Sequence, residues 1–433
     1  MRFIIVNRPL YSSRLSLFSL LILIAFLLPS CLSLRPVSNS ISSPLTPYNP
    51  GKSIMNPQYV VYHSSATESV VFLKLLTSEV VFNQANAQVK NQARLKVIYT
   101  LYSSLTNNEI AARDTQQFVI DRESVKDQIV ASVKLSTEPG KTYLLDITLA
   151  DEIRQSTVRS RMLVDRFRAD NQQDWLVLSY PGNSVAFERF FYSGETFRLI
   201  KQSEKAERLY VSVFSPRNVL PLPPFSLEEQ PDNVPLPDST FYMAYSEQLM
   251  YKLGEQGIYV FHFKPEIRGL CLTQFGDRYP QVTQPADMLP PLQYITSHEE
   301  YQKLLTNADL KIAVDEFWLD KGKTFGNARD LIRVYYNRVV FANLYFPSSK
   351  QGWKTDRGMI YLLFGPPLSV DRAETRESWL YEATETGEKI TFEFNLTDDY
   401  WTGYDFKLKR KEEFRPLWNR AVDSWRRGKI FSM

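Results

Sequence analysis

The sequence from residue 93 to residue 105 reads ARLKVIYTLYSSL. Leu95, Val97, Tyr99 and Leu101 recur at every second position, which is the period of a β-strand with one buried face. Six further runs with the same alternation or with many β-branched residues surround it, at residues 59–63, 69–76, 116–120, 129–135, 143–149 and 157–164. Turn signals separate the runs. These seven strands predict a β-sandwich of immunoglobulin-like architecture over residues 56–166.

A second set of short apolar runs follows the polar break at residues 168–173. The runs lie at residues 174–179, 185–192, 196–200, 208–214, 248–253, 257–263 and 267–273. They predict another β-sandwich-like domain over residues 172–282. Residues 215–239 hold seven prolines and are excluded from a central strand, because proline lacks the amide donor that a strand ladder needs. We interpret them as a long loop in preference to a proline-rich ligand for a partner's groove.

The apolar period changes after residue 290. Ser297 is followed three residues later by Glu300, the pattern of a helix capping box. Residues 310–319, 328–346 and 414–427 have helical spacing, whereas strand character returns at residues 359–364, 378–381 and 390–394. The fold class predicted for the whole chain is therefore mostly β, with an α+β domain at residues 290–433.

The N-terminus has the pattern of an export signal. Arg2, Arg8 and Arg14 precede an apolar run at residues 15–28, which is short for a membrane span of about 20 residues. Leu28-Pro29-Ser30-Cys31 resembles a bacterial lipobox, which implies cleavage before Cys31 and lipidation of its thiol. An ordinary secretory signal or a retained anchor is the alternative. Residues 1–30 are thus a predicted lipoprotein signal peptide, and the Ser-, Pro- and Asn-rich residues 31–55 a flexible tether.

The resemblance to a lipobox implies a cellular location. Leu32 stands where a signal for retention in the inner membrane would place Asp, so we expect an outer-membrane lipoprotein that faces the periplasm. Because lipidation occupies Cys31, Cys271 has no partner for an internal disulfide and is expected to be a buried thiol. Removing residues 1–30 takes away three of the 51 basic residues and no acid, so 48 basic residues face 48 acidic ones. Nucleic acid is therefore not an expected partner.

The segment from residue 351 to residue 367, QGWKTDRGMIYLLFGPP, combines glycine, proline, tryptophan and opposite charges around an apolar run. It resembles the GWxTD domain family at Gly352, Trp353, Thr355, Asp356, Arg357, Gly358, Gly365, Pro366 and Pro367. The resemblance covers about residues 290–405. It implies a domain of bacterial exported proteins without an established activity. The resemblance therefore indicates a cellular location and does not indicate a catalytic activity.

The same motif residues have a structural interpretation. Gly352 suits a turn with positive φ, Thr355 or Asp356 can accept backbone N–H groups, and Gly365-Pro366-Pro367 ends a strand. Trp353 is then expected to pack against the helix at residues 328–346. In the functional interpretation, Asp356 and Arg357 form a cradle for a peptide or a glycan. We favour the structural role.

We predict a non-catalytic binding or scaffolding protein, anchored to the membrane by its N-terminal lipid and with an envelope protein as partner. The alternative is an envelope hydrolase or a polysaccharide-binding protein that uses Asp356 and Arg357, with Asp398 or Asp399 as the second carboxylate of a hydrolase. No cofactor, metal site or catalytic residue is predicted, and the three histidines, His63, His262 and His298, are expected to be structural. Trp418 and Trp425 near the C-terminus are interpreted as packing residues in preference to a second membrane contact.

Overall fold

The computed structural model describes residue 48 and residues 55–83, 91–103, 109–201, 208–216, 218–228, 236–264, 269–372, 375–383, 387–397 and 405–433. All of them belong to one compact unit, residues 45–433. The predicted signal peptide, Cys31, and all of the predicted tether except Tyr48 and Met55 lie outside the described residues.

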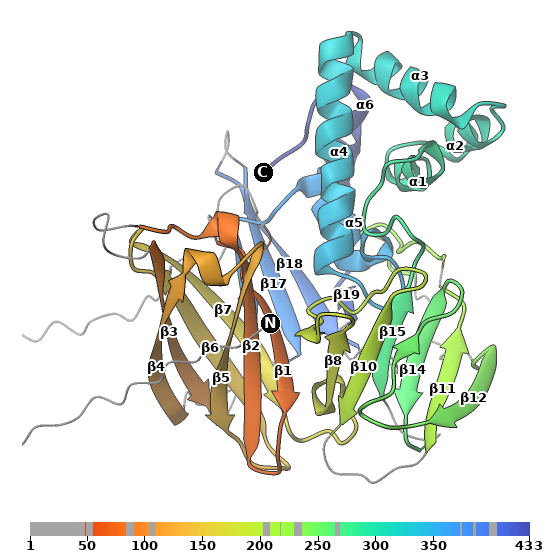
Figure 1. The fold of residues 1–433 in the computed structure, drawn as a ribbon. Coiled ribbons are helices and arrows are strands. Elements are labelled where there is room, and N and C mark those ends of the chain that lie inside the picture. Colours follow the sequence, from red (N-terminus) through yellow and green to blue (C-terminus); the bar gives the residue numbers. More distant parts are fainter. Residues whose placement is uncertain are drawn as a thin grey trace, which may run out of the picture. The chain divides into compact units, whose positions relative to one another are not determined.

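Seven antiparallel strands form the first β-region (Figure 1). One sheet has the order β1-β2-β5 and the other the order β4-β3-β6-β7. Leu73 and Leu135 from the first sheet share a single buried core with Leu95 and Leu145 from the second, as the two facing layers of a sandwich do. The strands are β1 (Gln58–His63), β2 (Glu68–Leu76), β3 (Gln92–Tyr102), β4 (Ile110–Asp121), β5 (Gln128–Ser136), β6 (Thr142–Asp151) and β7 (Ser156–Asp165). Each of the seven predicted runs overlaps one of them, and the run predicted at residues 93–105 extends beyond the end of β3.

Eight strands form the second β-region, in two sheets ordered β13-β10-β8-β9 and β12-β11-β14-β15. The strands are β8 (Trp175–Ser179), β9 (Ser184–Val185), β10 (Thr196–Lys201), β11 (Arg208–Phe214), β12 (Ser239–Ala244), β13 (Tyr251–Lys252), β14 (Gly257–His262) and β15 (Leu270–Gln274). Trp175, Phe197 and Leu272 lie in their shared core, and Cys271 is a buried thiol, as predicted.

Three details of this region differ from the sequence-based prediction. The strands predicted at residues 185–192 and 248–253 shrink to the two-residue strands β9 and β13. Strand β12, which was not predicted, is an exposed edge strand. An edge strand has one neighbour and little burial, so its sequence carries a weak period-two signal.

The C-terminal region combines helices with a four-stranded antiparallel sheet ordered β16-β17-β18-β19. The helices are α1 (Pro285–Met288), α2 (His298–Leu305), α3 (Leu310–Gly322), α4 (Phe325–Tyr345), α5 (Asp356–Phe364) and α6 (Arg415–Arg426), and the strands are β16 (Ser369–Arg372), β17 (Arg376–Glu382), β18 (Lys389–Leu396) and β19 (Phe406–Leu408). The predicted capping box at Ser297 and Glu300 is present at the start of α2. None of the helices in the described ranges has the length and apolar character needed to cross a bilayer.

The prediction of a strand at residues 359–364 is wrong, because these residues form the end of helix α5. All nine residues of α5 are buried, so no polar face reveals the helical period. Thr355 caps the helix by accepting a hydrogen bond from the Gly358 N–H at 3.0 Å. Gly365, with φ of 82°, follows its last turn. Gly365-Pro366-Pro367 therefore ends a helix and not a strand.

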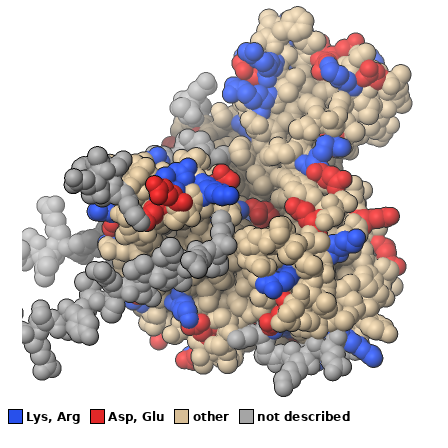
Figure 2. Space-filling model, viewed as in Figure 1, with Lys and Arg blue, Asp and Glu red and all other residues tan. Residues whose placement is uncertain are grey.

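The tryptophans near the C-terminus pack inward, as the sequence analysis favoured. Trp425 in α6 is buried and donates a hydrogen bond from Nε1 to the Leu363 carbonyl oxygen at 3.1 Å. Trp418 is buried in the same core. On the face of the molecule drawn in Figure 2, basic and acidic side chains lie interspersed.

Candidate functional site

The GWxTD motif forms the connection between helices α4 and α5, where a short 3₁₀ helix, η5 (Gly352–Lys354), makes the turn. A Cβ atom on Gly352 would lie 1.9 Å from the Ala342 carbonyl oxygen of α4, and one on Gly358 would lie 1.9 Å from the Gly352 carbonyl oxygen. Gly352 does not have the positive φ that was predicted. It is required for space instead, because two backbone segments approach each other there without room for a side chain.

Trp353 and Thr355 hold this turn in place. The Trp353 backbone N–H donates to Asn343 Oδ1 of α4 at 3.3 Å, and its carbonyl oxygen accepts from the Tyr294 hydroxyl at 3.0 Å. Thr355 Oγ1 also donates to the Gly352 carbonyl oxygen at 2.7 Å. Both side chains are buried, and Trp353 belongs to the same hydrophobic cluster as Val339 and Ala342 of α4, so its predicted packing against the long helix is confirmed.

Asp356 lies at the first turn of α5 and is 7% exposed. Its Oδ1 accepts from Arg410 Nη2 at 2.6 Å, and its Oδ2 accepts from the Leu408 N–H at 2.8 Å. Arg410 also donates to the Leu222 carbonyl oxygen at 3.0 Å, in the proline-rich segment of the second β-region. Burial raises the pKa of the Asp356 carboxyl, whereas Arg410 and the Leu408 N–H act in the opposite direction. Asp356 thus joins α5, the end of β19 and the proline-rich segment.

Arg357 pairs with a different element. Its Nη1 lies 3.4 Å from Glu377 Oε2 of β17, and both side chains are buried. The guanidinium also lies over the Phe406 ring, 4.3 Å from the centroid. Trp379 Nε1 donates to the same Glu377 oxygen at 3.1 Å. The carboxylate of Glu377 therefore has a cation and an indole donor on one oxygen.

Tyr48, which lies in the predicted tether, occupies the other oxygen of Glu377. Its hydroxyl donates to Glu377 Oε1 at 3.0 Å, and its carbonyl oxygen accepts from the Tyr361 hydroxyl at 2.9 Å. The Tyr48 ring lies 4.8 Å from Phe346 and 5.3 Å from Trp379, measured between centroids. The side chain is 7% exposed. Residue 48 is therefore part of the C-terminal core, which the composition of its neighbours did not indicate.

The turn after α5 surrounds a buried cation that the sequence analysis did not single out. Arg338 of α4 donates to the carbonyl oxygens of Leu362 and Leu363 at 3.2 and 3.1 Å, and to that of Phe431 at 2.8 Å. Burial lowers the pKa of Arg338 to about 10. Arg338 satisfies the carbonyl groups at the end of α5, which have no partner inside the helix.

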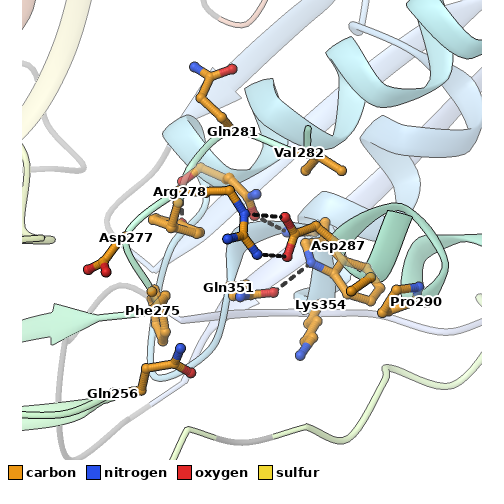
Figure 3. A pocket seen from close by; sticks show the side chains of 15 residues that line it. Gln256, Phe275, Asp277, Arg278, Gln281, Val282, Asp287, Pro290, Gln351 and Lys354 are labelled. Atoms are coloured by element: carbon orange, nitrogen blue, oxygen red, sulfur yellow. Dashed lines mark hydrogen bonds and ion pairs between the residues drawn. The ribbon is translucent and has the colours of Figure 1, made fainter. Parts of the chain in front are cut away.

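A cavity of about 330 Å³ lies beside the motif (Figure 3). The loop after β15 contributes Phe275 and Arg278, helix α1 contributes Asp287, and the motif turn contributes Gln351, Trp353 and Lys354. Arg278 and Asp287 form a two-point ion pair, with contacts of 2.8 and 3.1 Å.

The Lys354 side chain occupies the x position of the GWxTD motif. Its ammonium lies 5.2 Å from the centroid of the Trp353 ring and donates to Asn218 Oδ1 at 2.7 Å. Burial lowers its pKa. Trp353 is one of the lining residues and was predicted as a motif residue, whereas the other lining residues were not predicted. The position of Lys354 next to Trp353 inside the motif was the signal that could have indicated them.

The other residues considered for a catalytic role either make hydrogen bonds that hold the fold or lie outside the described residues. His63 bonds Ser69 Oγ at 2.8 Å and the Asp165 carbonyl oxygen at 2.9 Å, and His262 bonds the Lys264 carbonyl oxygen at 2.9 Å. Asp398 and Asp399 are outside the described residues. Within the described ranges, no group of three or more His, Cys, Asp or Glu side chains is placed to hold a metal ion.

The family model of the GWxTD domain matches residues 257–427. This match confirms the resemblance drawn from the motif, and it extends upstream into β14 and β15. No curated protein matches the chain. A solved structure from Bacteroides fragilis, assigned as a β-galactosidase, aligns at 10% identity over 35% of this chain and 19% of its own, with a TM-score of 0.16. An alignment with so low a score carries no inference about this chain.

Proposed function

Because residues 257–427 match the GWxTD domain, we propose that this chain is a lipid-anchored protein of the cell envelope that binds and organises other envelope components without transforming them. One observation carries the proposal. The charged motif residues Asp356 and Arg357 are buried and pair with Arg410 and Glu377, while the adjoining cavity presents polar groups around open space. The motif therefore builds a rigid wall for a binding site.

The use of Asp356 supports binding over hydrolysis. A glycosidase or an acid hydrolase needs a carboxyl group that faces its substrate, with a second one about 5 to 9 Å away. Both oxygens of Asp356 accept hydrogen bonds from Arg410 or the Leu408 N–H, and the side chain is buried. A carboxylate in these surroundings holds the fold together and does not meet a substrate.

The membrane anchor is proposed on the N-terminal sequence. Three arginines, an apolar run and a cysteine after Leu28-Pro29-Ser30 are the features that direct lipidation of Cys31. A lipidated cysteine that carries several acyl chains is stably anchored in a bilayer, since each buried methylene contributes about 0.8 kcal/mol. We propose the outer membrane, with the folded body in the periplasm.

Site-specific crosslinking in intact envelopes tests the binding role. A photoreactive amino acid at Gln256, which lines the cavity and is exposed, is expected to capture one defined envelope protein. The same amino acid at Val119, an exposed position on the edge strand β4, is the matched control. Equal capture at both positions would argue against a specific site. Turnover of isolated cell-wall material by the purified, folded protein would replace the proposal with the hydrolase.

Fractionation tests the anchor separately. Cys31→Ser is expected to release the protein from membranes into the soluble fraction, and to abolish labelling by a radioactive fatty acid. A variant that stays in the membrane fraction, unlabelled or not, would contradict anchoring through this thiol.

A further inference from the structure

Some of the charged side chains around the cavity have a partner of opposite charge, and Lys354 does not have one among the described residues. Arg278 and Asp287 neutralise each other, with two contacts shorter than 3.2 Å. Asp277 lies on the exposed rim, where its Oδ1 accepts the Ser193 N–H at 3.1 Å. Lys354 donates to the neutral amide oxygen of Asn218. Within the described part of the chain, no carboxylate lies within ion-pair distance of the Lys354 ammonium.

The Lys354 side chain is partly buried, which disfavours its charged form. The pKa of Lys354 is lowered, and the cause is loss of water around the charge. The Trp353 ring beneath the ammonium offers a cation–π contact and fixes its position, but does not neutralise it. An anionic group that enters the cavity would provide the missing opposite charge.

A second donor points to the kind of anion. Gln351 Oε1 accepts from Trp353 Nε1 at 2.8 Å, so the Gln351 amide is oriented with its NH₂ group left to donate. Gln351 and Lys354 come from the same turn and line the same space as Phe275 (Figure 3). Two residues that line one cavity and can donate hydrogen bonds suit a group that only accepts them and has two oxygens, which is a carboxylate.

The remaining lining fits a short peptide. Gln256 supplies an amide that can pair with a main-chain peptide group, and Phe275 and Val282 supply apolar surface for a side chain. A volume of about 330 Å³ is at the lower end of the range of small-ligand sites, about 300–1,000 Å³. It suits the last few residues of a chain and not a folded surface.

We propose that this cavity binds the C-terminal end of a peptide, with the terminal carboxylate held by the Lys354 ammonium and the Gln351 amide. The proposal rests on the binding role above and names the chemistry that the site accepts.

Ligand-observed NMR with the full chain in detergent micelles tests the proposal. The probes are N-acetyl-Ala-Ala-Ala with a free carboxylate and the same tripeptide as its C-terminal amide. The acid is expected to bind at least about tenfold more tightly than the amide, because the amide lacks the charge that pairs with the ammonium. Lys354→Gln is expected to abolish this preference, and Lys354→Arg to keep it.

Lys311→Gln is the matched control, since Lys311 is an exposed lysine of α3 that pairs with Asp315. It is expected to bind both probes as the parent chain does. Three outcomes would overturn the proposal: equal binding of acid and amide, a preference for the acid that survives in Lys354→Gln, or binding of glucuronate but not of the tripeptide acid. If the tripeptide acid fails while Gln256 still captures an envelope protein, the ligand chemistry is wrong and the binding role stands.

Discussion

Replacement of Tyr48 tests whether a residue far outside the C-terminal domain helps to hold that domain together. The Tyr48 hydroxyl is 3.0 Å from Glu377 Oε1, and its ring contacts Phe346 and Trp379. Glu377 in turn pairs with Arg357 of the GWxTD motif. Loss of the hydroxyl alone, and loss of the whole ring, should therefore have separable effects on stability.

The expected magnitudes follow from these contacts. Tyr48→Phe removes one hydrogen bond to a buried carboxylate, which costs about 1.5–3 kcal/mol. Tyr48→Ala also removes the buried ring, and comparable truncations of large aromatic side chains cost about 3–5 kcal/mol. Release of the Tyr48 backbone returns about 1–2 kcal/mol of conformational entropy. We therefore expect Tyr48→Ala to lower the free energy of unfolding of the C-terminal region by about 3–6 kcal/mol, the sum of the hydrogen-bond and ring terms less this entropy.

Urea unfolding of the full chain, followed by tryptophan fluorescence, measures this change, and limited proteolysis measures release of the segment. Tyr48→Ala is expected to speed cleavage between residues 31 and 55. Tyr242→Ala is the control, because Tyr242 is 62% exposed on the edge strand β12. Unfolding of Tyr48→Ala within about 0.5 kcal/mol of the parent chain, the range of an ordinary surface substitution, would refute the reasoning.

Three further predictions concern the turn, the buried ion pair and one histidine. Gly352→Ala should lower the free energy of unfolding, measured with heat or urea, by more than about 3 kcal/mol, because its Cβ would lie 1.9 Å from a carbonyl oxygen. Gly326→Ala in α4, where the space is open, is the control and should raise the free energy of unfolding by about 0.5–1 kcal/mol. Similar values for both variants would contradict the packing argument. Asp356→Asn should cost up to about 3–5 kcal/mol, because it leaves Arg410, whose side chain is 16% exposed, without its carboxylate. The double change to Asp356→Leu and Arg410→Met should recover most of that loss, and a double variant no more stable than Asp356→Asn would count against this explanation. Burial lowers the pKa of His63 from its ordinary value of 6.5 to about 4. The neutral imidazole therefore contributes fully to stability above pH 6.5, and up to about 3 kcal/mol of the free energy of unfolding is lost as the pH falls toward 4. The stability of His63→Gln should change less over this interval, and a pH profile equal to that of the parent chain would contradict the prediction.

The first β-region could be predicted well because each strand has one buried and one exposed face. In β3, buried residues alternate with more exposed ones along almost the whole strand, as the sequence from Ala93 indicated. Strand β4 was recognised at residues 116–120 alone, although it spans Ile110–Asp121. Its residues are mostly exposed at the edge of its sheet, so no apolar period marks its first half.

Helix α5 marks the limit of reasoning from periodicity. A segment that is buried on all sides has no polar face, and a short apolar run such as MIYLLF can then be a strand or a helix. The signals that distinguish the two lay at its ends. Thr355 followed by Asp356 is a favourable helix start, and Gly365 is a favourable helix stop. End signals therefore deserve more weight than composition wherever a run of fewer than ten apolar residues lies between them.

The partners of the motif charges could not be predicted from their neighbours in sequence. Asp356 meets Arg410, and Arg357 meets Glu377, across loops whose paths only the fold determines. Tyr48 reaches the same Glu377 from 329 positions away in the sequence. Such a buried carboxylate is costly unless every oxygen has a partner, so the tyrosine hydroxyl, the indole and the guanidinium are required together. Asp356 and Arg357 are therefore better explained as structural residues of the turn than as residues that contact a substrate. Among the charged residues of the motif, Lys354 lines the cavity and is the one that we propose to bind a ligand.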